Sequence, residues 1–162
     1  MEKINFTIAK FVSNVWPLGL FPFAQGTLCS FFAAIIGFLI NSLFGSEITL
    51  LLAILSGIAG WFSTNMYIKK SNNEDPSEVV IDEFSGQLIA SSAAGTSLLF
   101  NILGFILFRI LDVLKPGIIK KVENLRGATG VMMDDWVAGS FVALFLITLS
   151  IFGLIDYNWY MA

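Results

Sequence analysis

Two pairs of adjacent carboxylates are the strongest chemical signal in this sequence. Asp82 and Glu83 lie in the segment VVIDEFSG, and Asp134 and Asp135 lie in VMMDDWVAG. In both segments an aromatic residue and a glycine follow the acids, a pattern that predicts two similar helix starts facing each other. The helix dipole favours an acid at an amino end by only about 0.3 to 1 kcal/mol, which accounts for one pair but less well for two. Carboxylates gathered at one place repel one another or take up protons unless a cation holds them ionised. The pairs therefore predict a cation site.

Residue types that are scarce or absent narrow the choice of metal. Histidine is absent, which excludes the commonest general base and any zinc or copper site with histidine ligands. Cys29 is the one cysteine, and its apolar surroundings predict a small buried side chain. Oxygen ligands alone select a hard ion, and Mg²⁺ is the usual choice where phosphate is also bound. The predicted ligands of this metal are the carboxylates of Asp82, Glu83, Asp134 and Asp135.

A third polar segment, FRILDVLKPG, lies between the two acid pairs. Arg109, Asp112 and Lys115 recur every three residues along one face, and Pro116 is expected to end the helix. One interpretation is a helix at the membrane interface, with cations that extend toward water and a surface pair between Arg109 and Asp112. The other makes Arg109 and Lys115 clamps for phosphate, with Asp112 orienting them or joining the metal ligands.

Two segments rich in small residues offer further contacts for an anion. In PFAQGTLCS, Thr27 is expected to cap a helix that starts near Leu28 and to leave free amides for a phosphate. The segment RGATG, residues 126–130, is expected to be a loop that leads into the helix of Asp134. Neither segment matches a Walker loop, which ends in Gly-Lys-Ser or Gly-Lys-Thr.

Composition places these polar segments in a membrane protein. Hydrophobic residues make up 56% of the chain, charged residues only 13%, and the mean hydropathy is +0.81. A span of the bilayer needs about 20 apolar residues, and four charge-free stretches reach that length. We therefore expect an all-α, polytopic membrane helical bundle, with residues 1–162 forming a single membrane-embedded domain. The four stretches are Phe11 to Ser46, Ile48 to Ile68, Phe84 to Phe108 and Trp136 to Ile155.

The distribution of cations predicts that one stretch does not cross the membrane. If all four crossed once from a cytoplasmic amino terminus, the five cations between Arg109 and Arg126 would lie outside, against the positive-inside tendency. The small and polar residues of SSAAGTS, at 91–97, favour a re-entrant helical hairpin near residues 84–108. It would place all nine cations on one side and leave only Glu47 and Asp156 on the other. The alternative is one straight helix whose small residues pack against neighbours.

Taken together, the polar segments resemble the bacterial phosphatidylglycerophosphatase A family. The matching pieces are GLFPFAQGT, VVIDEFSGQ, FRILDVLKP and GVMMDDWVAG, which follow the order and approximate spacing of the family. The chain departs from the family pattern at Gln25 in the first piece, at Cys29 just after it, and at Ala128 in the loop before the last acidic pair, where a second glycine is usual. These departures affect the phosphate loops and leave the charged side chains in place.

The resemblance implies a Mg²⁺-dependent lipid phosphatase that converts phosphatidylglycerophosphate to phosphatidylglycerol and inorganic phosphate. Such an enzyme would be a multi-pass protein of the bacterial inner membrane with its active site facing the cytoplasm. The residues that the resemblance makes catalytic are Asp82, Glu83, Asp112, Asp134 and Asp135, and those that bind the substrate phosphate are Thr27, Arg109 and Lys115.

Several alternatives stay open at this level. The nucleophile is either metal-bound water or an aspartate that forms a phosphoenzyme. A different function is a non-enzymatic carrier or binder of divalent ions, although the charge-free stretches place no acid inside a span. Another is an enzyme that transfers a phosphoalcohol from a nucleotide-activated lipid. Membrane lipids are the expected surroundings, no protein partner is implied, and the few scattered basic residues exclude a nucleic-acid partner.

Overall fold

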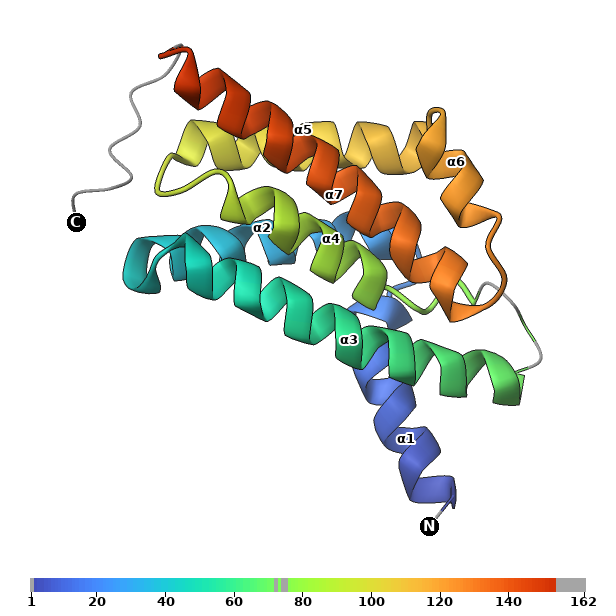
Figure 1. Ribbon diagram of the computed structural model, residues 1–162. Helices are drawn as coiled ribbons and strands as arrows, with labels where there is room; N and C mark the ends of the chain where they lie inside the picture. The colour runs from blue at the N-terminus through green and yellow to red at the C-terminus, as the bar shows by residue number, and fades with distance from the viewer. Residues whose placement is uncertain (1, 72, 74–75, 154–162) are drawn as a thin grey trace.

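The computed structural model describes residues 2–71, 73 and 76–153, and within this part of the chain the protein is built from helices. Five of them, α2, α3, α4, α5 and α7, run back and forth along one direction, while α1 extends away from the bundle and the short α6 links α5 to α7 (Figure 1). The predicted all-α bundle is confirmed. The elements are α1 (Glu2–Ser13), the 3₁₀ helix η1 (Leu18–Leu20), α2 (Gln25–Phe44), α3 (Ser46–Ser71), α4 (Ile81–Ser92), α5 (Leu98–Leu114), α6 (Ile118–Glu123) and α7 (Ala128–Ile151).

Three helices, α2, α3 and α7, are long and apolar enough to cross a membrane. Their outer faces carry exposed apolar side chains, such as Leu39, Leu55 and Leu144. Exposed surface of this kind is unfavourable in water and suits contact with lipid chains. The protein is therefore a membrane protein with several spans, as the sequence predicts.

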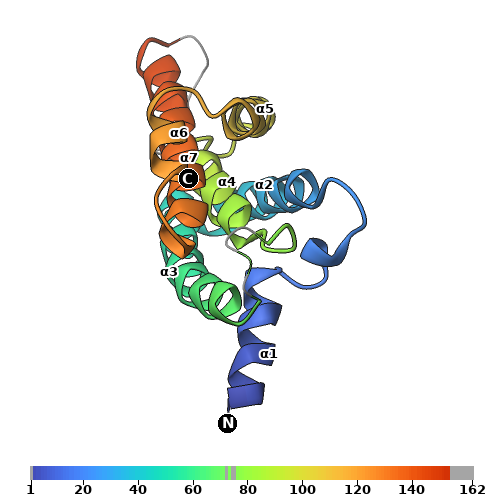
Figure 2. The ribbon, with the colours of Figure 1, turned by 90° about the vertical axis from the view of Figure 1, so that its right-hand side faces the viewer.

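The short helix α4 lies in the middle of the bundle, in contact with α2, α3, α5 and α7 (Figure 2). Two glycines allow its backbone to approach that of α7. A Cβ atom on Gly139 would lie 2.2 Å from the carbonyl oxygen of Gly86, and one on Gly86 would lie 2.6 Å from that of Asp135. Larger residues at these positions would push apart the two helices that carry the acid pairs.

The stretch between residues 84 and 108 is a helical hairpin, as predicted, and the interpretation as one straight helix is wrong. The turn of residues 93–97 joins α4 to α5, which runs back in the opposite direction (Figure 1). Gly95 has a φ of 57°, a conformation that favours glycine because it lacks a Cβ atom. The second arm, α5, is longer than expected and continues to Leu114.

Polar side chains of the neighbouring helices satisfy the backbone at this turn. Asn41 of α2 donates hydrogen bonds to the carbonyl oxygens of Ser91 (2.7 Å) and Gly95 (2.9 Å), and Thr49 of α3 donates to the Asn41 side chain (2.6 Å). Below the turn, Asn101 connects α5 to α2 by donating to the carbonyl oxygen of Ala34 (2.9 Å). Because lipid supplies no hydrogen bonds, a break between helices at membrane depth is stable only when the protein provides them.

These chain directions give the bundle two chemically different ends. The α2–α3 and α4–α5 connections lie at one end, and the α3–α4 connection and the α5–α6–α7 segment lie at the other (Figure 1). Glu47 lies in the first turn of α3 at the first end, which we call the hairpin end. Lys69, Lys70 and the residues of the two acid pairs belong to the second, which we call the charged end. The prediction that Asp156 lies opposite the cations falls outside the described residues.

Candidate functional site

Three carboxylates meet between α4 and α7 at the charged end. Asp82 and Glu83 lie in the first turn of α4, and Asp135 comes from α7; one oxygen from each lies within 4.8 Å of the other two. Asp82 Oδ1, Glu83 Oε2 and Asp135 Oδ1 are buried, and none has a hydrogen-bond partner within the described residues. A buried ionised oxygen without a donor is strongly unfavourable. The cluster therefore has the composition and the unmet bonding of a cation site.

The donor set fits a hard divalent ion. Mg²⁺ takes oxygen ligands at about 2.0 to 2.1 Å, so that its ligand atoms lie about 3 to 4 Å from one another. The three carboxylates approach this spacing and offer no softer ligand atom. Asp82, Glu83 and Asp135 are thus the side chains that would hold Mg²⁺. The identity of the ion stays a prediction.

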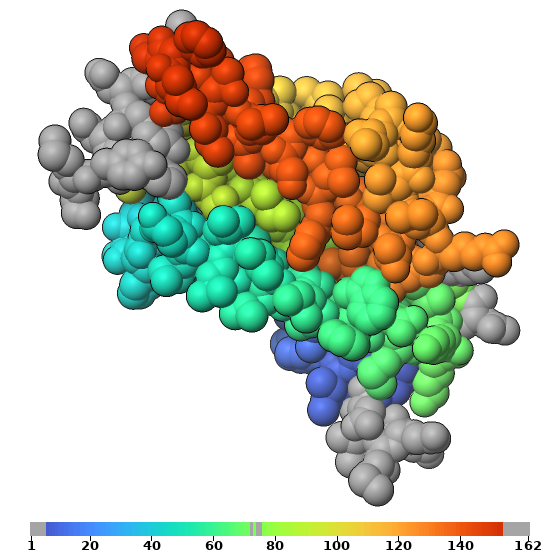
Figure 3. Space-filling model, viewed as in Figure 1, coloured from blue at the N-terminus to red at the C-terminus, as the bar shows by residue number. Residues whose placement is uncertain are grey.

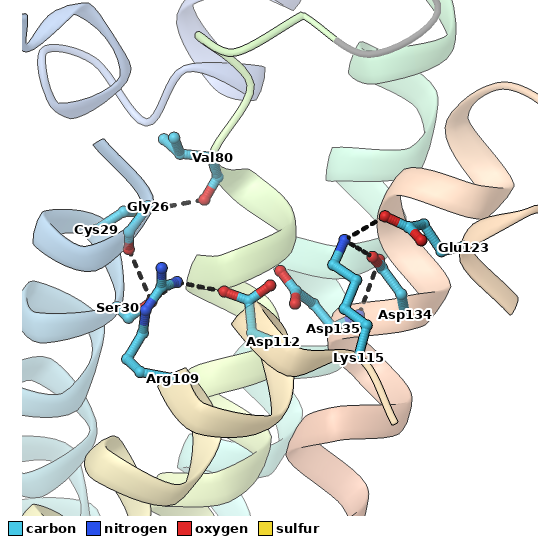
Figure 4. Close-up of polar contacts among 10 residues, drawn as sticks. All are labelled: Gly26, Cys29, Ser30, Val80, Arg109, Asp112, Lys115, Glu123, Asp134 and Asp135. Atoms are coloured by element: carbon cyan, nitrogen blue, oxygen red, sulfur yellow. Dashed lines mark hydrogen bonds and ion pairs between the residues drawn. The ribbon is translucent and has the colours of Figure 1, made fainter. Parts of the chain in front are cut away.

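Arg109 of α5 points toward α2, on one side of Asp135 of this cluster (Figure 4). Its Nη1 is 2.5 Å from Asp112 Oδ2 and donates to Ser30 Oγ at 3.3 Å. Ser30 in turn donates to the carbonyl oxygen of Gly26 at 2.8 Å. The predicted pair of Arg109 with Asp112 forms, and the contact to α2 holds the guanidinium at the site rather than at the open surface.

Lys115 lies on the other side of Asp135 and bridges two acids (Figure 4). Its Nζ is 2.7 Å from Asp134 Oδ2 and 2.8 Å from Glu123 Oε1. Burial alone would lower the pKa of Lys115, but its hydrogen bonds to Asp134 and Glu123 raise the pKa above its ordinary value. Hydrogen bonds from Lys115 and Lys120 lower the pKa of Glu123. Lys115 therefore stays charged at neutral pH.

A polar pocket of about 170 Å³ opens between these groups. Its walls include Asp82, Asp134, Lys115 and Glu123, and Gly127 lies at its edge. The pocket can hold several water molecules or a phosphate group. The pocket is therefore lined both by Asp82, a carboxylate of the cluster, and by the positively charged Lys115.

The second acid pair does not begin its helix, contrary to the sequence prediction. The helix α7 starts at Ala128, after Gly127 with a φ of 65°, so Asp134 and Asp135 lie in its second turn. Residues 128–130, expected in a loop, are helical for the same reason. The helix dipole acts mainly within the first turn and does not explain this pair. The two carboxylates point differently: Asp135 joins the cluster, whereas Asp134 faces Lys115.

The cap predicted for Thr27 is also wrong. The helix α2 begins at Gln25, because Ala24 adopts a left-handed conformation with a φ of 53° and turns the chain into the helix early. Thr27 lies in the first turn of α2, where backbone amides have no partner inside the helix. Its proposed contact with phosphate stays a prediction.

Three contributors to the site were not singled out from the sequence. A Cβ atom on Gly26 would lie 2.0 Å from Glu83 Oε1 and 3.4 Å from Arg109 Nη1, so the start of α2 touches both groups. Ser30 accepts a hydrogen bond from Arg109, and Glu123 accepts one from Lys115. Ser30 follows Gly26 by one helical turn, which is a weak signal, and nothing in the sequence pairs Glu123 with Lys115. Cys29 is buried, as expected, and donates to the carbonyl oxygen of Val80 at 3.2 Å.

Comparison with known proteins identifies the family of the chain. The family model of phosphatidylglycerophosphatase A matches residues 11–150. Over 157 residues, the chain is 31% identical to phosphatidylglycerophosphatase A of Escherichia coli, covering 91% of this chain and 87% of that protein. It is 31% identical to phosphatidylglycerophosphatase A of Haemophilus influenzae over 128 residues, or 78% of each chain.

A relative with a different name is also similar. A putative phosphatidylinositol-3-phosphatase of Bacteroides thetaiotaomicron is 38% identical over 128 residues, which are 75% of this chain and 80% of that protein. No solved structure matches the chain significantly. The chain belongs to the phosphatidylglycerophosphatase A family and is a lipid phosphatase.

Proposed function

We propose that this protein hydrolyses the terminal phosphomonoester of phosphatidylglycerophosphate, giving phosphatidylglycerol and inorganic phosphate, in a Mg²⁺-dependent reaction. The observation that carries this proposal is the cluster of Asp82, Glu83 and Asp135, whose buried oxygens have no partner in the described residues. The cluster lies between the positively charged side chains of Arg109 and Lys115, each held by an ion pair. The names of the Escherichia coli and Haemophilus influenzae relatives support the substrate.

Each side chain has a definite task in this proposal. Asp82, Glu83 and Asp135 hold the ion, which when bound neutralises charge and polarises the phosphoryl group. Arg109 and Lys115 donate hydrogen bonds to the other phosphate oxygens, with Asp112 and Asp134 fixing their positions. Catalysis then rests on positioning the phosphate and stabilising its charge.

The reaction balances with water as the second reactant. A water oxygen forms a bond to phosphorus, the bond from phosphorus to the glycerol oxygen breaks, and a carboxylate takes the proton of the water while the glycerol oxygen gains one. An attack by Asp82 or Asp134 would instead leave phosphate covalently bound to that residue. Rapid quenching with labelled substrate distinguishes the two routes, since only the second leaves label on the protein.

The charged end is proposed to face the cytoplasm of the bacterial inner membrane. Lys69, Lys70, Arg109 and Lys115 gather there, and cytoplasmic loops are typically rich in such residues. Reporter fusions after Gly117 should then report a cytoplasmic position and fusions after Phe44 an external one. An external reporter at Gly117 would contradict this orientation.

A phosphoinositide is a second candidate substrate, because the relative from Bacteroides thetaiotaomicron is the more identical one. Both lipids carry a phosphomonoester at the headgroup, so the same carboxylates and cations would serve. Phosphate release from purified protein, measured with each lipid in turn, decides between them. Faster release from the phosphoinositide would replace the proposed substrate and leave the site unchanged.

Removing divalent ions tests the metal role. A chelator should stop phosphate release, and adding Mg²⁺ should restore it. A bound ion also stabilises the folded state, so chelation should lower the unfolding temperature of the wild type and leave that of Asp135→Asn nearly unchanged. Undiminished turnover in chelator would contradict the metal role, whereas ion binding without phosphate release from any lipid would favour an ion-binding protein.

A further inference from the structure

An apolar groove runs along the outside of α5 where it passes α2. It has a volume of about 480 Å³ and is lined by side chains of α5 from Phe105 to Leu114 and by Thr27 of α2. This part of α5 is about 14 Å long at 1.5 Å per residue. Ile106 and Ile110 in the groove are 48% and 46% exposed. The groove is therefore open to the surrounding lipid and is long enough to hold part of an acyl chain.

One charged side chain connects this groove to the carboxylates. Arg109 lines the groove and also pairs with Asp112, which lies beside Asp135 of the carboxylate cluster (Figure 4). Gly26 lies between them: a Cβ atom there would touch both Glu83 and Arg109. If Arg109 holds the phosphate of a lipid, the acyl chain of that lipid would lie in the groove and the phosphate oxygens would lie next to the cation site.

Three other apolar grooves lack this feature. The largest of them, of about 540 Å³, lies between α3, α4 and α7, on the face that Figure 3 shows, and its charged lining residue is Glu47 at the hairpin end. The other two, of about 260 Å³ along α7 and about 230 Å³ between α3 and α7, have uncharged lining residues. An anionic headgroup is repelled by Glu47 and finds no cation in the other two grooves. Charge therefore favours the α2–α5 groove.

We propose that the α2–α5 groove binds an acyl chain of the glycerophospholipid substrate while Arg109 holds a phosphate of its headgroup. The proposal rests on the function proposed above and adds the path by which the lipid reaches the site from the membrane. The substrate then moves sideways out of the bilayer, without leaving its apolar surroundings, and only its headgroup enters the polar pocket.

The test compares one side chain in each groove. Ile106→Trp narrows the α2–α5 groove with a bulkier ring, and Ile147→Trp does the same in the groove beside Glu47. The two isoleucines are similarly exposed, at 48% and 43%, so the variants should fold equally well. Phosphate release is measured with a dioleoyl and a dihexanoyl form of the same phosphomonoester lipid in detergent micelles.

For Ile106→Trp we expect the ratio of kcat/KM for the long-chain lipid to that for the short-chain lipid to fall about tenfold. The ratio for Ile147→Trp should stay within about twofold of the wild-type value. An unchanged ratio in Ile106→Trp, or an equal fall in both variants, would overturn the proposal.

A second measurement separates this proposal from the proposed function. A phosphomonoester lipid with a photoreactive group on its acyl chain is cross-linked to the wild-type protein without any turnover. The proposal expects the label on peptides of α5 and α2, and labelling confined to α3 and α7 would contradict it. A wild type that labels on α5 but releases no phosphate would refute the phosphatase activity alone.

Discussion

The two ends of the bundle bury polar groups in opposite ways. At the hairpin end, Asn41 and Thr49 form hydrogen bonds with each other and with the backbone of the turn. At the charged end, Asp82, Glu83 and Asp135 each keep a buried oxygen without a partner in the described residues. The first arrangement stabilises an interrupted helix in a membrane, whereas the second leaves carboxylates that either take up protons or bind a cation.

Charge makes this difference meaningful. Gln87 in the middle of α4 and Asn101 of α5 also have unpaired amide oxygens, but these are neutral and their amide nitrogens are bonded. An unpaired neutral oxygen costs about 1 to 3 kcal/mol, and an ionised one considerably more. A cluster of buried carboxylates without donors therefore indicates function more strongly than buried polar residues in general.

Among changes at the two ends, neutralising one of the proposed ion ligands should have the largest effect on activity. Asp82→Asn or Asp135→Asn should lower phosphate release about 10³-fold, because it removes a charge that holds the ion. In chelator, the unfolding temperature should equal or exceed that of the wild type without its ion, because repulsion among the buried carboxylates falls. Enzyme assays and thermal unfolding in detergent measure the two effects.

The control for this prediction is Glu47→Gln at the hairpin end, the same loss of charge in a first helical turn. Its activity should stay within about twofold of the wild type. Retained turnover in Asp135→Asn would remove that residue from the site, and a large loss in Glu47→Gln would show that the two ends are not separate in function.

A single methyl group tests how tightly the start of α2 fits the site. In Gly26→Ala the new Cβ atom would lie 2.0 Å from Glu83 Oε1, so the carboxylate must move. We expect a loss of activity of about 10²-fold with little change in unfolding temperature, since a small displacement of reacting groups has effects of this size.

Gly104→Ala is the matched control for Gly26→Ala. Its Cβ atom would meet Leu146 Cδ1 at 3.3 Å, a contact that the flexible side chain can relieve within the apolar core. Its activity should stay near that of the wild type. Equal activity in the two variants would show that Glu83 moves freely and is not held in place by α2.

The fold was more predictable from the sequence than the details of the site. Long charge-free stretches require helices in lipid, and the distribution of cations required the reversal that residues 93–97 make. The helix starts near Thr27 and Asp134 were misplaced, because single residues with positive φ, Ala24 and Gly127, start these helices earlier. Propensity gives little warning of such a conformation at an alanine.

The sequence also does not predict that the side chains of Asp134 and Asp135 point toward different partners. Adjacent residues on a helix point about 100° apart, so one pair of acids serves two partners. Which one meets the cluster depends on how α7 packs against α4, through the close approach of Gly139 to Gly86. The contact between Lys115 and Glu123 depends on the fold of α6 over the site, which no local pattern encodes.

At the hairpin end we expect stability to change without chemistry. Asn41→Ala removes the donor to the carbonyls of Ser91 and Gly95 and the acceptor for Thr49. The free energy of unfolding should fall by about 1 to 3 kcal/mol, while activity below the transition stays within about threefold of the wild type. Ser42→Ala, which removes a hydroxyl bonded to Phe38 within its own exposed helix turn, should change neither. A loss of activity in folded Asn41→Ala would mean that the turn also positions the site.

The smallest expected effect comes from Glu123, the acid that holds Lys115 from α6. Glu123→Gln should lower phosphate release only about two- to fivefold, because Asp134 still binds Lys115, and should lower stability by about 0.5 kcal/mol at pH 7. The pKa of Glu123 is lowered in the folded protein from an ordinary value of 4.5 by Lys115 and Lys120. Its contribution to stability is therefore present above about pH 4.5 and is lost as the pH falls through the lowered pKa. The difference in unfolding temperature between wild type and Glu123→Gln should shrink on acidification, and a difference that grew would place the stabilising partner of Lys115 elsewhere.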